Sequence, residues 1–301
     1  MTTEQSSATT CIVCGSAVIL PGAIRYSKDG FDVARCDSCG LMFRAELPTE
    51  EELEQIYDGS YFCSGLGDTG GQGYNDYLSE AELHRETARR RLERLERLAP
   101  PGRLLDVGAA AGFFVAEAAA RGWDACGIDI AAEMVVWGRA QLGVVLERQT
   151  VAELDAEPAS FDAVTMWDYI EHAVDPRGDL ARAHELLRPG GAVALSTGDA
   201  GSFAARVSGA HWHLLTPRHH NYFFTAASLR QLLRRLGFEV VYEGHPGVRY
   251  SVEYLTYKLR TMLDVGPVRR IADTVSESRL GQLKVPANLG DIVTVIGRKP
   301  V

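Results

Sequence analysis

The sequence contains no apolar run approaching the roughly 18 residues that a bilayer-spanning helix needs. Its first segment, MTTEQSSATT, lacks the basic and apolar regions of a signal peptide. We therefore expect a cytoplasmic protein with no membrane partner. An excess of basic residues is absent as well, because 31 Lys and Arg stand against 40 Asp and Glu, a formal charge of −9. No nucleic-acid partner is expected, since affinity from neutralising phosphates needs the opposite balance.

Apolar segments typical of buried strands alternate with helical segments from residue 103 to the C-terminal end. The strand-like segments are RLLDVG (103–108), DACGIDI (124–130), FDAVTMWD (161–168), GAVALSTG (191–198) and DIVTVIGRK (291–299). This alternation predicts a Rossmann-like, doubly wound α/β sheet. A chain of 301 residues with 46% hydrophobic and 24% charged residues can bury such a core and still carry a small appendage.

A glycine turn joins the first of these strands to a helix in LLDVGAAAG (104–112). No GK[ST] follows it, which excludes a P-loop, and the spacing of Gly108 and Gly112 fits a pyrophosphate poorly. Asp129 ends the next strand 21 residues after Gly108, where a carboxylate can accept hydrogen bonds from ribose hydroxyls. Asp106, an acid before the turn, suits a ligand with a cationic amino or sulfonium group.

These segments, in this order, resemble the class I S-adenosylmethionine-dependent methyltransferases over residues 74–300. LLDVGAAAG is similar to the family's first motif, with Ala110 in place of the middle glycine, and GIDI (127–130) to its ribose-binding strand end. TVAEL (150–154) lies where the family contacts adenine. FDAVTMWDYIEHAVDP (161–176) is similar to the motif on the sulfonium side, and LLRPGGAVALST (186–197) to the turn into the fifth strand.

The resemblance implies S-adenosylmethionine as the cofactor, with a set of contacts along these motifs. The expected cofactor-binding residues are Asp106, Gly108, Ala109, Gly112, Asp129, Ile130, Val151, Ala152, Trp167 and Asp168. An NAD-dependent oxidoreductase is the alternative, but its fingerprint would place a glycine at position 110.

Four of the six cysteines form two CxxC pairs, CIVCG and CDSCG, each followed by glycine. Four thiolates suit tetrahedral zinc in a closed structural site, so Cys11, Cys14, Cys36 and Cys39 are the expected metal ligands. The ribbon that they hold either stabilises the fold alone or also shapes substrate entry. Similar modules occur in methyltransferases of nucleotide-linked sugars and natural products. The expected domains are a disordered tail (1–10), a zinc-binding ribbon (11–56), a lid loop and helix (57–99) and the methyltransferase domain (100–301).

Methyl transfer to a hydroxyl needs a general base, and histidine is the usual base near neutral pH. His172 follows the fourth strand, and the histidine-rich stretch 209–229 resembles the family's substrate-side insertion, with His220 at the matching position. The catalytic candidates are His220, His172 and His219; the substrate-contacting candidates are Tyr74, Tyr77, His211, Trp212 and Tyr222. The plainer alternatives are a turn cap for His172 and packing for the aromatic residues. A second metal is disfavoured because the histidine pairs lack carboxylate partners.

The expected activity is methyl transfer to a hydroxyl of a sugar, a nucleotide-linked sugar or a secondary-metabolite scaffold. C- or N-methylation of a similar precursor is the nearest alternative, and a non-catalytic zinc-ribbon docking protein is another. RNA or protein acceptors are disfavoured, because the first 60 residues hold more acids than bases. The run RRRLERLER (89–97) pairs arginines with glutamates at helical spacing and predicts a solvated face. The sequence leaves the oligomeric state open.

Overall fold

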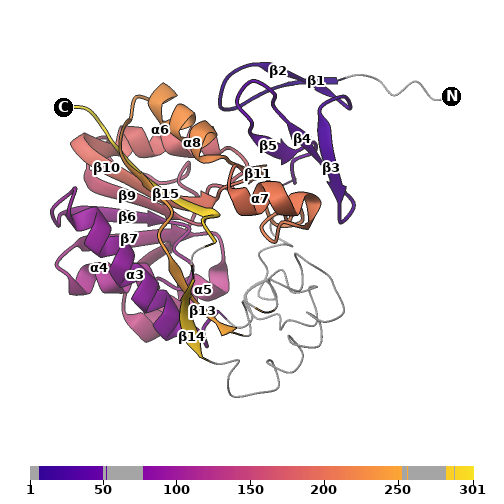
Figure 1. The fold of residues 1–301 in the computed structure, drawn as a ribbon. Helices are drawn as coiled ribbons and strands as arrows, with labels where there is room; N and C mark the ends of the chain where they lie inside the picture. Colours follow the sequence, from indigo (N-terminus) through magenta and orange to yellow (C-terminus); the bar gives the residue numbers. More distant parts are fainter. Residues whose placement is uncertain (1–6, 50–51, 53–76, 253–255, 257–282, 288) are drawn as a thin grey trace.

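A computed structural model describes residues 7–49, 52, 77–252, 256, 283–287 and 289–301 of the chain (Figure 1). Its central sheet has seven strands in the order β12–β15–β10–β9–β6–β7–β8. The bounds are β6 (Arg103–Val107), β7 (Asp124–Asp129), β8 (Val145–Arg148), β9 (Phe161–Trp167), β10 (Leu187–Gly198), β12 (Glu239–Gly244) and β15 (Ile292–Arg298).

The strand order confirms the expected doubly wound α/β fold. From β6 the chain builds outward through β7 and β8, then returns to add β9 and β10 on the other side, all in parallel. Ligands of such sheets bind at the carboxyl ends of the strands beside this reversal, here between β6 and β9. The last strand, β15, runs antiparallel to both β10 and β12, an orientation that the sequence pattern did not specify.

Both faces of the sheet are covered by helices, which explains why its strands are apolar throughout rather than alternating. Successive strand residues point to opposite faces of the sheet, so Leu104 and Leu105 pack in two different hydrophobic clusters, one on each face. Helices α3 (Ala81–Glu96) and α4 (Phe113–Ala120) cover one face, and α6 (Pro176–Leu186) and α8 (Ala226–Arg235) cover the other. Val135 of α5 (Ala132–Leu142) packs with Val115 of α4 and Leu146 of β8.

The N-terminal ribbon consists of five short strands, drawn in indigo in Figure 1. They are β1 (Ser7–Thr10), β2 (Ala17–Leu20), β3 (Ile24–Lys28), β4 (Phe31–Arg35) and β5 (Met42–Arg44). Ser7–Thr10 were expected in a disordered tail, and this expectation was wrong for them. The knuckle between Thr10 and Ala17 turns the chain back, so that β1 pairs antiparallel with β2.

A strand from the methyltransferase domain completes the ribbon. The sheet β3–β4–β5 gains β11 (Tyr222–Phe223) as its fourth member, with Tyr222 opposite Phe43 and Phe223 opposite Met42. Between β10 and β11 the chain forms α7 (Phe203–Ser208) and a short 3-10 helix, η1 (Gly209–His211), and Figure 1 shows α7 beside β11 under the ribbon. The ribbon and the methyltransferase domain therefore share hydrogen bonds as well as packing.

The remaining expectations about organisation fall partly outside the described residues. Within the expected lid segment, only 77–99 are described, and they contain α3. Strands β13 (Val248–Ser251) and β14 (Lys284–Ala287) form a separate antiparallel pair. Among the described helices, none combines the length and apolar character required to cross a bilayer.

Candidate active site

The glycine turn between β6 and α4 has a backbone that explains its composition. Gly108 and Gly112 have φ angles of 73° and 80°, the left-handed region that favours glycine. A Cβ atom on Gly108 would lie 2.6 Å from the ring of Tyr169, so this position also excludes a side chain by contact. The Gly108 and Ala109 N–H groups donate to the Ile128 carbonyl at 2.9 and 3.0 Å, which holds the turn against β7.

Ala110, where the family's first motif has glycine, is left-handed too, with φ of 47°. Its N–H donates to Asp129 Oδ2 at 2.7 Å, and Asp129 Oδ1 accepts from Ala131 N–H at 2.8 Å. The structure thus brings Asp129 directly to the glycine turn. Burial raises the pKa of Asp129, while these backbone hydrogen bonds lower it. A carboxylate with two N–H partners still has lone pairs with which to accept ribose hydroxyls.

Asp106 lies inside the sheet, at the point where β6 and β9 meet. Its Oδ1 accepts a hydrogen bond from Thr165 Oγ1 at 2.6 Å. Burial raises the pKa of Asp106 to about 7, against the lowering effects of Thr165 and of the Arg91 charge. The carboxyl is therefore a deep element of the site, and its contact with a cationic ligand stays a prediction.

A second acidic residue, Asp168, lies just after β9 with a left-handed φ of 50°. Arg91 Nη2 lies 2.5 Å from Asp168 Oδ2 and donates to Ser196 Oγ at 3.0 Å, and Ser196 Oγ donates to Asp168 Oδ1 at 2.7 Å. Although burial raises the pKa of Asp168, the charge and hydrogen bond of Arg91 bring it below the ordinary value. An ionised carboxylate is thereby held at the edge where the sulfonium side is expected.

The sequence analysis missed Arg91, which it placed on a solvated face. Ala88, Leu92 and Leu95 form the buried face of α3, and a residue three positions after Ala88 projects toward the same side. The Arg91 guanidinium lies over the Trp167 ring, 4.7 Å from its centroid. The apolar spacing of α3 is the signal that could have identified this arginine.

The other expected cofactor residues take varied positions. Ile130 lies at the end of β7 and is 37% exposed, Val151 is buried and Ala152 is exposed. Trp167 is buried in the core, with its ring centroid 5.5 Å from that of Phe114. Ile130 and Ala152 therefore offer surface to a ligand, whereas Trp167 packs beneath Arg91.

On the neighbouring part of the edge, two of the three catalytic candidates face one another. The rings of His172 and His220 lie edge to face, with centroids 4.7 Å apart. His172 Nδ1 is 2.8 Å from the His219 carbonyl, and His220 Nδ1 is 3.0 Å from the Leu214 carbonyl. Because a carbonyl only accepts, each Nδ1 carries the proton, and each neutral ring presents Nε2 as an acceptor.

Burial keeps these imidazoles neutral. It lowers the pKa of His172 to about 4 and that of His220 well below its ordinary value. The charge of His172 lowers the pKa of His220 further, and that of His219 lowers the pKa of His172. Burial lowers the pKa of His219 to about 4 as well, and its backbone carbonyl is the group that engages His172. A base matched to neutral pH is therefore more readily found in the carboxyl group beside them.

That carboxyl group is Glu171, which is 5% exposed and whose Oε2 has no hydrogen-bond partner among the residues that the structure describes. Burial raises its pKa to about 8, with a further contribution from the negative charge of Asp168. The ligand atoms of Glu171, His172 and His220 lie within 4.8 Å of one another. The expectation that the histidines lack a carboxylate partner was therefore wrong. The adjacency of Glu171 and His172 after the fourth strand was the available signal.

A tightly packed crevice adjoins this group. Its lining consists of Glu171, Thr197, Gly198, Trp212, Leu214, His220, Tyr222 and Phe223. Glu171 from the turn after β9, the end of β10 and the 209–224 stretch together line it. The substrate-side role of the 209–224 stretch stays a prediction.

The expected substrate-contacting residues mostly have structural contacts. Trp212 is buried and donates from Nε1 to Asp291 Oδ2 at 3.1 Å, and Tyr222 donates to the Val174 carbonyl at 3.1 Å. Tyr77 stacks on His84 with centroids 4.0 Å apart. His211 is exposed on η1, and Tyr74 lies outside the described residues. The burial and hydrogen bonds of Trp212 and Tyr222 fit the plainer packing interpretation, although both also line the crevice beside Glu171.

The four clustered cysteines come together as the two CxxC pairs predict. Their Sγ atoms lie within 4.8 Å of one another, and the Cys11–Cys39 and Cys14–Cys36 Sγ pairs are each 3.5 Å apart. All four are free thiols. The two knuckles are built alike, since Gly15 N–H donates to Cys11 O and Gly40 N–H to Cys36 O, both at 2.8 Å. Sulfurs bound to one zinc ion lie about 3.8 Å apart, so the donor set fits zinc.

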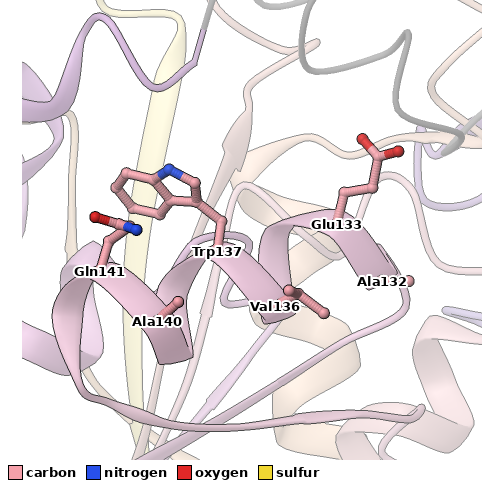
Figure 2. A pocket seen from close by; sticks show the side chains of 6 residues that line it. All are labelled: Ala132, Glu133, Val136, Trp137, Ala140 and Gln141. Carbon is pink, nitrogen blue, oxygen red and sulfur yellow. The ribbon is translucent and has the colours of Figure 1, made fainter.

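A separate apolar hollow of about 480 Å³ lies along the outer face of α5 (Figure 2). Its lining is Ala132, Glu133, Val136, Trp137, Ala140 and Gln141, which recur every four residues and so share one helix face. Glu133 is the one ionisable side chain among these six. The hollow offers no acid–base pair and is not the centre of the chemistry.

The strand order and this edge are those of a class I S-adenosylmethionine-dependent methyltransferase. A family profile described as "Methyltransferase domain" matches residues 79–243, and the chain belongs to this family. It is a methyltransferase that uses S-adenosylmethionine, and the oxidoreductase alternative falls away. The assignment of the glycine turn and Asp129 to this cofactor stays a prediction.

Curated relatives of the chain are named O-methyltransferases. A ubiquinone biosynthesis O-methyltransferase of Xanthomonas axonopodis pv. citri is 35% identical over 188 residues, covering 54% of this chain and 79% of that protein. The enzyme of the same name from Thiobacillus denitrificans is 33% identical over 175 residues, covering 54% and 75%.

Solved structures share the fold. A methyltransferase from Archaeoglobus fulgidus has a TM-score of 0.50 at 20% identity, covering 74% of this chain and 99% of that one. A putative methyltransferase from Bacillus halodurans has a TM-score of 0.50 at 13% identity, covering 72% and 100%. At these identities the likeness concerns the fold alone.

Proposed function

We propose that this protein transfers the methyl group of S-adenosylmethionine to a hydroxyl group of a small molecule. The observation that carries the proposal is the buried Glu171 carboxyl group, which lies beside the imidazoles of His172 and His220 and whose Oε2 has no partner in the described part of the chain. A hydroxyl group must lose its proton as it attacks, whereas an amine often needs only positioning. The names of the relatives, which are O-methyltransferases, support the same acceptor atom.

In the proposed mechanism, the chain holds the cofactor at the glycine turn and holds the acceptor beside Glu171. The bound cofactor supplies a methyl group activated by a sulfonium. Asp129 binds the ribose hydroxyls, and the glycine backbone of the 108–112 turn lets the cofactor approach closely. Asp168, ionised by its pair with Arg91, places negative charge toward the sulfonium side. Glu171 Oε2 takes the acceptor proton, and His172 and His220 orient the hydroxyl in line with the methyl group.

The proposed acceptors are a sugar, a nucleotide-linked sugar or a secondary-metabolite scaffold. By analogy with the names of the relatives, a ring hydroxyl of a quinone precursor joins this set. Glu171, His172 and His220 would have the same roles with each of these acceptors, because each acceptor must lose a proton from a hydroxyl oxygen. C- or N-methylation would not require the Glu171 carboxylate to take a proton from oxygen.

We also propose that Cys11, Cys14, Cys36 and Cys39 bind one zinc ion, which stabilises the ribbon. Four thiolates leave no open coordination position, so the ion has a structural role. The near-identical knuckles and the short Sγ distances support this assignment. A protein of this kind is expected to carry one zinc per chain.

The test is a methyl-transfer assay with S-adenosylmethionine labelled in its methyl group and a panel of catechols, phenols, sugars and nucleotide sugars. RNA and a mixed protein substrate are the negative controls. Labelled ether products in wild type, with loss in Glu171→Gln and unchanged cofactor binding, would support the proposal. Label found only on carbon, nitrogen, RNA or protein would overturn it.

Because Glu171, His172 and His220 also form a donor set for a cation, the assay is repeated with EDTA and then with added Mg²⁺. The proposed proton transfer predicts that Mg²⁺ changes nothing. Turnover that EDTA abolishes and Mg²⁺ restores would instead assign these residues to a metal that binds the acceptor oxygen.

A further inference from the structure

The ribbon is hydrogen-bonded to the segment that carries His219 and His220. β11 begins two residues after His220 and pairs with β5, and the Arg44 N–H donates to the Asn221 carbonyl at 2.9 Å. Side chains of the ribbon strands enter the same two cores as β11, because Phe43 packs with Tyr222 and Met42 packs with Phe223. The histidine segment therefore follows the position of the ribbon.

Asn221 connects this segment to the other half of the acceptor side. It is 2% exposed, and its N–H donates to the Glu171 carbonyl at 2.8 Å. Its side-chain Nδ2 donates to the His172 carbonyl at 2.7 Å. Asn221 thus binds the backbone of both Glu171 and His172, in the turn after β9. The carbonyl of Asn221 is in turn bound by β5.

A third contact closes the arrangement. His172 Nδ1 donates back to the His219 carbonyl at 2.8 Å, so the turn after β9 and the histidine segment each hold the other. Tyr222 N–H adds a bond to the Glu171 carbonyl at 3.1 Å. Because a buried donor or acceptor that loses its partner is destabilised, each of these bonds favours the positions of the other two.

We infer that the N-terminal ribbon is an integral part of the acceptor side of the active site, and that Asn221 is the positioning residue through which β5 sets the Glu171–His172 turn against His220. This inference rests on the proposed roles of Glu171, His172 and His220 and of the zinc-bound ribbon. It does not make Asn221 a catalytic residue. On the cofactor side, by contrast, Asp129 is held by N–H groups of Ala110 in the glycine turn and of Ala131.

The first test separates the β5–β11 hydrogen bond from other effects at Arg44. Arg44→Ala and Arg44→Pro both remove the guanidinium that lies over Phe31, but only proline also removes the N–H that donates to Asn221. Amide hydrogen exchange of the zinc-loaded, full-length protein is compared between the two variants. We expect peptides covering 171–174 and 219–224 to exchange about tenfold faster in Arg44→Pro than in Arg44→Ala.

The second readout is calorimetric binding of S-adenosylhomocysteine, which needs no knowledge of the acceptor. Affinity should stay within about twofold of wild type in both variants, since the glycine turn is not touched. Equal exchange of 219–224 in the two variants would overturn the inference, as would parallel loss of cofactor affinity and protection in Arg44→Pro. Absence of binding to wild type would instead contradict the proposed function.

The role of Asn221 is tested with Asn221→Asp, which keeps the shape and removes the Nδ2 donor. A carboxylate there repels the His172 carbonyl, whereas a protonated carboxyl group can donate to it again. At pH 8 we expect amide exchange at 171–174 to be about tenfold faster in Asn221→Asp than in wild type. When the two proteins are compared at lower pH, this ratio of exchange rates should become smaller. On any acceptor that is turned over, kcat should fall while the KM for S-adenosylmethionine does not change. A defect of equal size at every pH, or a change confined to the KM for the cofactor, would contradict a positioning role.

Discussion

The cofactor side and the acceptor side share one edge of the sheet, but they are assembled differently. On the cofactor side, the bond from Ala110 to Asp129 spans 19 residues and joins two consecutive strand-to-helix turns. On the acceptor side, the bonds that hold His172 and Asn221 span 47 and 49 residues, and a strand of the ribbon is added to them. The difference teaches that cofactor binding is a local property of the fold, whereas the acceptor side depends on parts that are distant in the chain.

The largest expected effect is the separation of the two sides by loss of zinc. A double substitution, Cys36→Ser with Cys39→Ser, should remove the metal and unfold the ribbon, as small zinc domains unfold without metal. Methyl transfer should then fall by about a hundredfold or more, while S-adenosylhomocysteine binding is retained within a few-fold. Zinc content by mass spectrometry, turnover and calorimetry make the measurement.

Cys126→Ser is the matched control, because this cysteine lies in β7 and outside the cluster. It should keep one zinc per chain and normal turnover. Full turnover in the zinc-free double variant would show that the acceptor side does not depend on the ribbon.

The next effect concerns the chemical step on the acceptor side alone. Glu171→Gln keeps the shape of the side chain and removes the ionisable group, so kcat should fall by about 10²- to 10⁴-fold, the usual contribution of a general base. Binding of S-adenosylhomocysteine should not change. Retention of kcat would remove Glu171 from the mechanism and return the role to the histidines.

A smaller effect is expected on the cofactor side. Asp129→Ala removes the carboxylate proposed to bind the ribose, and charge-assisted hydrogen bonds of this kind are worth about 1.5–3 kcal/mol. Calorimetry should therefore show a loss of S-adenosylhomocysteine affinity on the order of ten- to a hundredfold. Asp124→Ala, on the exposed first residue of the same strand, is the control. Equal affinities for the two variants would contradict the ribose assignment.

The smallest effect is on stability as a function of pH. Burial raises the pKa of Glu171 from 4.5 to about 8, so the folded protein binds a proton that the unfolded chain has already lost. Stability from this group is complete below about pH 4.5 and declines as the pH rises through about 8. One pKa unit corresponds to about 1.4 kcal/mol, so wild type should lose at least about that much stability between pH 5 and pH 8.

Thermal or urea unfolding of wild type and Glu171→Gln over this pH range makes the measurement. The variant lacks the titrating group, so the difference in unfolding free energy between the two proteins should grow in its favour toward pH 8. Parallel pH profiles would show that Glu171 does not carry the buried proton.

Much of the fold was predictable from particular residues. The glycines at 108 and 112, the acid at 129 and the apolar runs around them act within a few residues, through backbone sterics and strand burial. The CxxC pairs predicted a four-cysteine cluster for the same reason, since each knuckle is a local turn. The expected cofactor and acceptor roles of these residues remain predictions.

Other features could not be read in this way. The sequence assigns Arg91 to a charged helix face. In the folded chain its guanidinium donates hydrogen bonds to Asp168, just after β9, and to Ser196 of β10. Ser7–Thr10 are mostly polar, and they form a strand because β2 lies next to them. Glu171 and His172 lie close enough to His220 to form a set of possible metal ligands, although His220 is nearly fifty residues later in the chain.

The sequence by itself determined the α/β sheet, the glycine turn with its acidic partner and the cysteine knuckles, because each depends on neighbours along the chain. Only the tertiary structure decided that β11 joins the ribbon, that Asn221 binds the Glu171–His172 turn and that Glu171 lies buried between imidazoles. These contacts depend on packing between distant segments. Burial by these segments raises the pKa of Glu171 and leaves its Oε2 without a partner among the described residues, and the proposed chemistry rests on both features.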